Sequence, residues 1–534
     1  MGYAHDYASA ILHRGRIPME PVDFVPDWAD RPRKAKYYPQ AETLPLPEPV
    51  GPVPGAPVPG APGAGGFSLP LLSGMLQDSY GLVGRRLGVQ ANTDLAALPH
   101  YPQANWSRGT ASGGGLYPVG VYWAAGAGGP LTPGVYHYAP HVHGLRRLLT
   151  GDVTGDVRAA LGAGEDGPTQ YLLLSVKYWQ NAFKYNSFSF HAVSMDVGTV
   201  VQTWRLWAAE RGLRIAPTLW FDEERLAGLL GVAPEEEGIF AAVPLEWEGA
   251  ATAGASASGS ASAGRPPVAV PPPGLSVRHR DAERSRTVLR FETLRRIHGA
   301  TLGRTADRPA PGALDAAAAF APRGGEPEPL PAPAAAPMGA AAALRARRSS
   351  FGRFDASRPL GAAQLAAALA DCAATSVGSE AERPDGPRLT SLYAFVNHVE
   401  GVAPGTYAYD PVAHALRLVV AGAPGSFLQR NYFLSNYNLE QAGAVLVPTV
   451  RTTKVLDAVG DRGYRLVGAT VGAVAQTFYT TAAAHGLGAG VALGFDNVSY
   501  AERLGLTDTD EAPLLVMLLG HERPRPADFR HEIA

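Results

Sequence analysis

The stretch VGTVVQTW at residues 197–204 returns as VGAVAQTF at residues 471–478, at an offset of 274 positions. The same offset aligns residues 212–213 with 486–487 without any gap. Self-similarity at one fixed spacing is the signature of a duplicated unit. The sequence therefore predicts two copies of one domain, each of roughly 200 residues.

A second block supports the duplication at an offset of 271 positions. Residues 134–146 align with residues 405–417, and three matched pairs are Tyr138 with Tyr409, His143 with His414, and Leu145 with Leu416. With 534 residues, the chain is also longer than one hydrophobic core usually serves. We expect four parts: an N-terminal arm with a Pro/Gly spacer (1–66), a first domain (67–248), a low-complexity linker with a charged helical segment (249–340), and a second domain (341–534).

Composition and charge exclude several classes of function. Lys and Arg number 46 and Asp and Glu 48, so the net charge of −2 leaves no basic field to hold nucleic acid or an acidic membrane. The sequence contains no apolar run of about 18 residues, so we expect no membrane-spanning helix. We also expect no signal peptide. The single cysteine, Cys372, excludes an internal disulfide framework, is expected in the core, and fits a reducing cytoplasm.

The repeated stretch lies in a predicted amphipathic helix. Val193, Val197, Val200 and Trp204 share one face, and Gly212 follows where a left-handed C-terminal cap is expected. Apolar runs predict strands at 116–125, 134–138, 171–176, 392–396, 406–409, 444–447 and 514–519. Strands and helices mix without regular βαβ alternation. This favours an α+β class, with mixed or antiparallel sheets flanked by helices.

Ser112-Gly113-Gly114-Gly115 precedes the first of these strands. Glycines let a backbone approach a flat ligand closely and present its N–H groups to it. A tight turn without a ligand explains the same residues equally well.

Two further motifs carry charge. Arg347-Arg348-Ser349 suit bidentate binding of a phosphate, although a solvated charge run is the simpler explanation of this stretch alone. Lys184-Tyr185 stand just before the repeated helix and can act as base and acid if burial lowers the pKa of the lysine. A surface lysine beside a packed tyrosine is again the simpler alternative.

Together these motifs resemble those of the nitroreductase-like flavoproteins, and specifically the SagB-type azoline dehydrogenases of ribosomal peptide biosynthesis. Residues 32–49 read PRKAKYYPQAETLPLPEP. They resemble the N-terminal lead-in of that family, which contains the motifs K-Y-P and LPLP. Residues 112–118 resemble its P-S-G-G-A-L-Y-P signature, with Ala111 where the proline stands. The resemblance covers the arm and both repeats.

The resemblance implies FMN as the cofactor and gives roles to individual residues. Arg347-Arg348-Ser349 resemble the R-R-S-x-R flavin-phosphate motif, with Phe351 in place of the last arginine. Lys184 and Tyr185 fall on the catalytic Lys-Tyr pair of the family. The implied cofactor-binding residues are Ser112, Gly113, Gly114, Arg347, Arg348, Ser349, Arg353, Gly486, Leu487, Gly488 and Arg523.

The two copies keep complementary parts of this set. The first copy has a Pro/Gly run where the arginines belong, and Arg214 in place of Gly488. The second copy has Ala458-Val459 in place of the Lys-Tyr pair. Nitroreductase-like folds lay FMN between two copies, so we expect an internal pseudo-dimer with one FMN per chain.

The implied activity is FMN-dependent oxidation of thiazoline and oxazoline rings, in a ribosomally made precursor peptide, to thiazoles and oxazoles. The implied partners are that azoline-containing precursor peptide and the cyclodehydratase of the same pathway; the Gly/Ala/Pro-rich composition is compatible with a thiopeptide pathway. Two alternatives stay open: an NAD(P)H-dependent nitro- or quinone reductase on the same fold, and a degenerate scaffold subunit without FMN. Pairing of two chains into a homodimer also stays open.

Several titratable residues are weaker candidates. His141 and His143 have metal-ligand spacing, but no carboxylate or cysteine partner is evident, so a turn is favoured and no metal site is predicted. Asp196 and His191 lie close to Lys184 in sequence and can support it.

Overall fold

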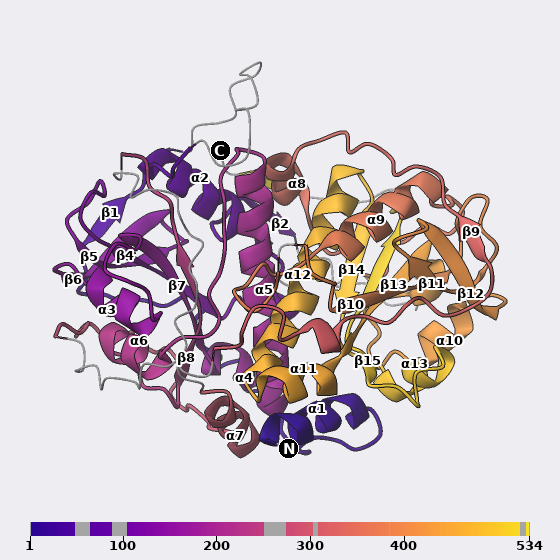
Figure 1. Ribbon diagram of the computed structural model, residues 1–534, viewed down its shortest axis with the longest axis horizontal. Coiled ribbons are helices and arrows are strands. Elements are labelled where there is room, and N and C mark those ends of the chain that lie inside the picture. The colour runs from indigo at the N-terminus through magenta and orange to yellow at the C-terminus, as the bar shows by residue number, and fades with distance from the viewer. Residues whose placement is uncertain are drawn as a thin grey trace.

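The computed structural model describes residues 2–48, 65–87, 104–249, 274–302, 308–383, 385–523 and 530–532. Within these ranges, two antiparallel sheets stand on either side of a central pair of long helices (Figure 1). The predicted α+β class is therefore confirmed. Most of the predicted spacer and the Ala/Gly/Ser-rich part of the linker lie outside the described residues.

The first sheet has the strand order β1-β6-β5-β4-β7-β8. Its central strand β4 is buried along its whole length, as the continuous apolar run predicts. The strands are β1 (Thr43–Pro45), β4 (Val119–Ala125), β5 (Gly134–Ala139), β6 (Gly144–Thr150), β7 (Gln170–Lys177) and β8 (Glu237–Pro244).

The second sheet repeats this plan in the order β14-β16-β13-β10-β11-β12-β9, with β15 paired to β13. Its strands are β9 (Pro327–Pro329), β10 (Thr390–Val396), β11 (Gly405–Asp410), β12 (Ala415–Ala421), β13 (Ala444–Arg451), β14 (Gly488–Ala492), β15 (Glu511–Pro513) and β16 (Val516–Gly520). A small third sheet contains β2 (Gly84–Leu87), β3 (Ala104–Ser107) and β17 (Arg530–Glu532).

Helices fill the space between and around the sheets. They are α1 (Tyr3–His13), α2 (Leu69–Ser79), α3 (Thr154–Ala160), α4 (Trp179–Tyr185), α5 (Ser189–Ala209), α6 (Glu223–Leu230), α7 (Glu292–Ala300), α8 (Ala340–Ala346), α9 (Ala362–Ala374), α10 (Gly425–Arg430), α11 (Thr452–Val459), α12 (Gly463–Ala484) and α13 (Asn497–Arg503). Short 3₁₀ turns are η2 (Gly113–Gly115), η3 (Asn186–Phe188), η5 (Asp315–Ala317) and η6 (Leu439–Gln441).

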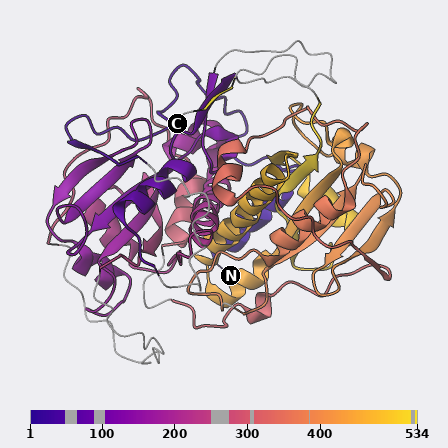
Figure 2. The same ribbon diagram turned by 90° about the horizontal axis from the view of Figure 1, so that it is seen from above.

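The repeated stretch forms the central pair, α5 and α12, which lie against each other between the two sheets (Figure 2). A methyl group on Gly198 would overlap the backbone of Ala469, and one on Gly472 would overlap the backbone of Met195. The two glycines are equivalent positions of the repeat, 274 residues apart. Because neither carries a Cβ, the helices approach to backbone contact, and the duplicated sequence supplies both sides of the interface.

The second block of the repeat is also matched in three dimensions. The Tyr138 hydroxyl and His143 Nδ1 are 2.9 Å apart, and the Tyr409 hydroxyl and His414 Nδ1 are 2.8 Å apart. Both histidines have a left-handed backbone, with φ of 42° and 47°. His143 is therefore a turn residue, as favoured over a metal ligand.

Both predicted helix caps adopt the left-handed conformation that glycine tolerates. Gly212 follows the end of α5 with φ of 68°, and Gly486 follows the end of α12 with φ of 65°. The next residue, Leu213 or Leu487, donates its N–H back to the carbonyl of Ala208 or Ala482.

The charged segment before the second domain differs from expectation. The helical pattern of residues 275–304 yields only α7, whereas residues 274–291 run in an extended path over the first domain. Tertiary contacts outweigh helix propensity here: Val277 donates its N–H to the Leu229 carbonyl, and Asp281 accepts from the Tyr37 N–H at 2.7 Å.

Candidate functional site

The glycine turn is fastened to the central helix by a buried carboxylate. Asp196 on α5 accepts hydrogen bonds from the Ser112 hydroxyl at 2.7 Å and from the Gly113 N–H at 2.8 Å. The Ser112 oxygen in turn accepts from the Tyr117 N–H at 2.9 Å. Gly114 has φ of 61°, which requires glycine for an unstrained turn. The turn is thus held in one shape by α5.

Burial gives Asp196 an unusual titration. Desolvation raises its pKa to about 7, although the hydrogen bonds from Gly113 and Ser112 oppose this. A carboxyl group whose folded pKa lies above its unfolded value takes up a proton on folding. Its stabilising contribution is therefore present below about pH 4 and lost as the pH rises through about 7.

Asp196→Asn should consequently flatten the pH dependence of stability. We expect the free energy of unfolding of the native protein to fall from pH 5 to pH 8 by up to about 3 kcal/mol more than that of the variant. Urea unfolding at a series of pH values measures the difference. Parallel pH profiles for the two proteins would show that Asp196 does not titrate in this range.

Lys184 and Tyr185 lie directly beside the glycine turn. A methyl group on Gly114 would come within 2.5 Å of the Tyr185 hydroxyl and 2.7 Å of Lys184 Nζ. Lys184 Nζ is 4.6 Å from the centroid of the Tyr185 ring. Burial, with a smaller contribution from Tyr185, raises the pKa of Tyr432, which places this second-domain residue near the pair. The two motifs of the first domain therefore share one place in the fold, and that place faces the second domain.

Arg347 reaches across from the second domain to the glycine turn. Its Nε donates to the Gly109 carbonyl at 2.8 Å and its Nη2 to the Arg108 carbonyl at 2.8 Å. Gln476 on α12 strengthens the same junction, because its side chain accepts from the Ala111 N–H at 2.9 Å and donates to the Gly109 carbonyl at 3.2 Å. The loop that enters the turn is thus bound by the other half of the chain.

The rest of the second-domain motif runs along the edge of β14. Arg348 forms an ion pair with Glu522, and the Ser349 and Tyr479 hydroxyls are 2.8 Å apart. A methyl group on Gly488 would lie 2.9 Å from Ser350 Oγ, so only glycine fits there.

The remaining predicted cofactor residues gather at the same strand edge. The Arg523 N–H donates to the Arg353 carbonyl at 2.8 Å, next to the bridge between Phe354 and Glu522. Gly486 and Leu487 lead from α12 into Gly488. The printed contacts between the halves at this place join Arg347 and Gln476 to residues 108–111. We call the interface around this junction the mixed groove, with Ser112–Gly114, Lys184 and Tyr185 on its first-domain side and Arg347–Ser349 with Gly488 on its second-domain side.

The position of the first domain that is equivalent to Tyr479 has different neighbours from Tyr479 itself. Arg205, the repeat equivalent of Tyr479, donates to the Ser376 carbonyl. Gly378 packs against its guanidinium. Glu380 accepts from the N–H groups of Leu219 at 2.9 Å and Trp220 at 2.6 Å. Residues 376–380 therefore pack against the first domain at Arg205, the position equivalent to Tyr479.

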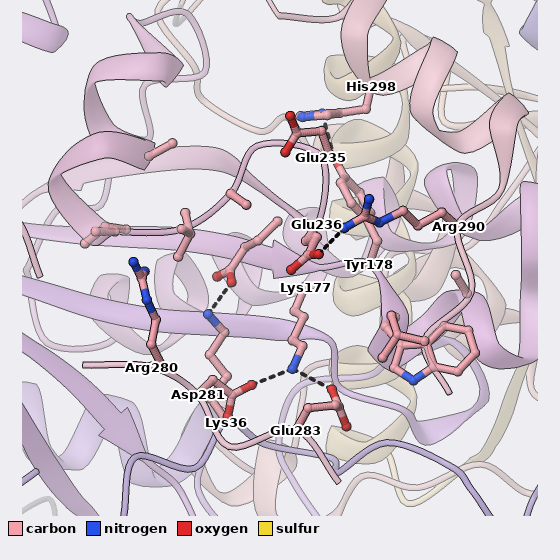
Figure 3. Close-up of a pocket in the computed structure, with 18 of the residues that line it drawn as sticks. Lys36, Lys177, Tyr178, Glu235, Glu236, Arg280, Asp281, Glu283, Arg290 and His298 are labelled. Atoms are coloured by element: carbon pink, nitrogen blue, oxygen red, sulfur yellow. Dashed lines mark hydrogen bonds and ion pairs between the residues drawn. The ribbon is translucent and has the colours of Figure 1, made fainter. Parts of the chain in front are cut away.

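A larger cavity, of about 630 Å³, lies at the other end of α4 between the first domain and the segment that leads into α7 (Figure 3). None of the predicted site residues lines it. Lys177 forms ion pairs with Asp281 at 2.5 Å and with Glu283 at 2.6 Å, and all three residues line the cavity. Figure 3 draws both ion pairs as dashed lines. These pairs fasten residues 281–283 to the first domain.

No group of three or more metal-ligating side chains occurs among the described residues. No helix within those residues is long and apolar enough to cross a membrane.

The residues predicted from sequence do not include several that contact the site or its counterpart from distant parts of the chain. Gln476 belongs to the repeated stretch, but only the fold brings it to the glycine turn. Arg108 and Glu380 stand in no recognisable motif, and their roles arise from tertiary contacts. For Asp196, closeness to Lys184 in sequence was the one available signal.

Comparisons with known proteins address the fold. The sequence model of the Nitroreductase family matches residues 344–521, from the end of α8 to just beyond β16. A solved structure of a provisionally named nitroreductase from Anabaena variabilis aligns with 98% of this chain and 100% of its own, with 21% sequence identity and a TM-score of 0.69. The chain has a nitroreductase-like fold.

Two further matches cover parts of this nitroreductase-like chain. A provisionally named nitroreductase of Methanocaldococcus jannaschii is 33% identical over 141 residues, which are 24% of this chain and 64% of the relative. This chain thus matches less than two thirds of that relative's length. A chain of the Escherichia coli microcin synthetase McbBCD complex, solved with truncated pro-MccB17 bound, is 20% identical over 34% of this chain and 70% of its own, with a TM-score of 0.29.

Proposed function

We propose that the protein is an FMN-dependent dehydrogenase that oxidises thiazoline or oxazoline rings of a ribosomally made peptide to thiazoles or oxazoles. The observation that carries this proposal is the hydrogen bond from Arg347, in the second-domain motif, to the carbonyl of Gly109, which precedes the glycine turn of the first domain. The motifs themselves resemble those of SagB-type dehydrogenases. The proposed partners are the azoline-containing precursor peptide and the cyclodehydratase that would make its rings.

The donors of the mixed groove fit an FMN. Glycine is needed at 114 and at 488 because neighbouring side chains, those of Tyr185 and Ser350 among them, already lie where a Cβ would be. The N–H groups of Gly114 and Ser349 have no acceptor among the described residues, so both can donate to a ligand. Arg348, 20% exposed in its side chain, supplies charge for a phosphate, with Arg353 and Arg523 close by. Arg347 would hold the glycine turn against the ring system.

The reaction removes two electrons and two protons from an azoline. A bound FMN would supply the hydride acceptor for this reaction, with dioxygen as the terminal oxidant. The protein must hold the ring over the cofactor and take up the remaining proton. We assign this proton transfer to Lys184 and Tyr185, which lie together beside Gly114 and face the groove.

The packing of residues 376–380 at Arg205 supports a single cofactor site per chain. Purified protein should contain one FMN per chain, measured as the ratio of released flavin to protein. A ratio near two would contradict the assignment of residues 376–380 as a plug of the second site.

Arg348→Ala should weaken FMN retention by roughly 10- to 100-fold, because a charge-assisted hydrogen bond to the phosphate is lost. Dialysis followed by flavin absorbance measures the dissociation constant. Arg358→Ala, an exposed arginine in the same segment, should bind FMN as the native protein does. Equal affinity of all three proteins would remove Arg348 from the phosphate site.

The substrate is tested by anaerobic reduction. Mixing the holoprotein with a thiazoline peptide should bleach the flavin band, and the peptide should lose two hydrogen atoms in mass. Bleaching by NADPH, with no reaction of the peptide, would favour a nitro- or quinone reductase instead. A colourless protein that binds no FMN would favour the scaffold alternative.

A further inference from the structure

The N-terminal arm places an exposed tryptophan beside the proposed proton-transfer pair. Trp28 is 50% exposed, and the centroid of its ring is 6.0 Å from Lys184 Nζ. The same Nζ lies 4.6 Å from the centroid of the Tyr185 ring and borders the exposed Gly114 of the glycine turn. Residues from the arm, from α4 and from the glycine turn therefore adjoin one another at a place that solvent reaches.

Polar contacts hold this part of the arm in position. Asp27 accepts a hydrogen bond from the N–H of Ala29 at 2.9 Å, which forms a tight turn around Trp28. The Asp30 carboxylate accepts from the N–H groups of residues 286–287 at 2.7 and 2.8 Å. Trp28 thus lies between two fixed points of the backbone, and its ring is exposed without belonging to a free chain end.

The protein covers only part of the Trp28 ring. Phe183 on α4 meets it edge-on, with the two centroids 5.3 Å apart and the planes at 86°. A single exposed apolar side chain is ordinary on a protein surface, so exposure alone indicates nothing. The place of Trp28 beside Lys184 is what distinguishes it, because a fixed, half-covered tryptophan is the kind of side chain that anchors a ligand.

A substrate ring at Lys184 would lie within reach of Trp28. A group that exchanges a proton with Lys184 comes within about 3 Å of its Nζ. Because Nζ is 6.0 Å from the Trp28 centroid, the reacting atom would lie at most about 9 Å from that centroid. Interacting rings have centroids roughly 4.5–7 Å apart. These distances allow one ring to contact both side chains.

We propose that Trp28 is a specificity-determining residue, a platform on which the five-membered ring of the peptide substrate packs while it faces Lys184. The proposal rests on the proposed function and names the part of the substrate that the arm recognises. A flat azoline or azole ring can lie against the indole, whereas the unmodified peptide segment presents no such face. The arm would then supply a wall of the site that neither copy of the repeat contains.

Unreactive product peptides test the platform by binding alone. The probes are a thiazole pentapeptide and the same peptide with Gly-Ser in place of the ring. In isothermal titration calorimetry with the FMN-loaded native protein, we expect the thiazole peptide to bind about 10-fold more tightly than its partner. Trp28→Ala should reduce this preference below about 2-fold, and Trp28→Tyr, which keeps a flat ring, should retain most of it.

Trp106→Ala is the matched control. Trp106 on β3 is also 50% exposed, but its ring packs against Arg85, whose Cζ is 5.5 Å from the ring centroid, instead of against Lys184. This variant should keep the full thiazole preference. An unchanged preference in Trp28→Ala would overturn the proposal, as would equal binding of the two peptides by the native protein.

Steady-state kinetics separate a platform from a merely structural role. With a thiazoline peptide, Trp28→Ala should raise KM by about 10-fold while kcat stays within about 3-fold of the native value, because stacking acts on the ground state and transition state alike. A lower kcat with an unchanged KM would assign Trp28 to the support of Lys184 and overturn the platform.

The flavin is the other flat ring that Trp28 could contact, and flavin content separates the two. Trp28→Ala should retain FMN as the native protein does. Loss of FMN without a change in peptide preference would assign Trp28 to the cofactor and overturn the platform. A thiazole preference that depends on Trp28, in a protein unable to oxidise thiazoline peptides, would support the platform while removing the proposed function. Oxidation of those peptides with a preference independent of Trp28 would do the reverse.

Discussion

Lys184→Ala should leave the protein yellow and lower turnover of an azoline peptide by ~10²–10⁴-fold, the usual contribution of a positioned general base. Lys184 Nζ lies beside the glycine turn and 4.6 Å from the centroid of the Tyr185 ring. Steady-state turnover and the flavin spectrum of the same preparation give both quantities.

The repeat offers a matched control for this experiment. Helix α11 corresponds to α4 in the second domain, and it carries Lys454 with a side chain that is 40% exposed. Lys454→Ala should turn over at the native rate. A bleached Lys184→Ala protein would reassign the lysine to cofactor binding, and native turnover in that variant would remove it from the chemistry.

Gly472→Val should lower the free energy of unfolding by about 1–3 kcal/mol or more, because overpacking at a backbone contact forces α5 and α12 apart. A single methyl group at this position already overlaps the backbone of Met195. The mixed groove lies across the same pair of helices, so FMN content should fall together with stability. Urea unfolding and flavin content measure the two effects.

Gly299→Ala provides the contrast. This glycine is also helical, in α7, but a methyl group there would meet no other atom within 4 Å. We expect the variant to be as stable as the native protein or more stable by up to about 1 kcal/mol. If Gly472→Val and Gly299→Ala had the same free energy of unfolding, close approach of the central helices would not stabilise the fold.

The repeat allowed much of the architecture to be predicted from sequence. The left-handed caps at Gly212 and Gly486 follow from local chemistry, because their conformation favours glycine wherever the helix ends. Burial of β4 likewise follows from its apolar run. These features depend on neighbours in sequence and on one hydrophobic pattern.

What escaped prediction depends on contacts between distant segments. The extended path of residues 274–291 is set by partners such as Leu229 and Tyr37, so the local helical pattern misleads. Arg347 suits a phosphate by motif, yet its guanidinium is bonded to the carbonyls of Arg108 and Gly109. The partner of a guanidinium depends on which unpaired hydrogen-bond acceptors the fold brings close to it.

The plug of residues 376–380 has a consequence for how this molecule can change over evolutionary time. In an assembly of two identical subunits, every substitution appears at both active sites, so a change that closes one site closes its twin. Here Arg205 and Tyr479 occupy equivalent positions with different neighbours, because a single gene encodes each separately. One half can therefore accept substitutions that the other half does not share, a freedom that an assembly of two identical subunits lacks.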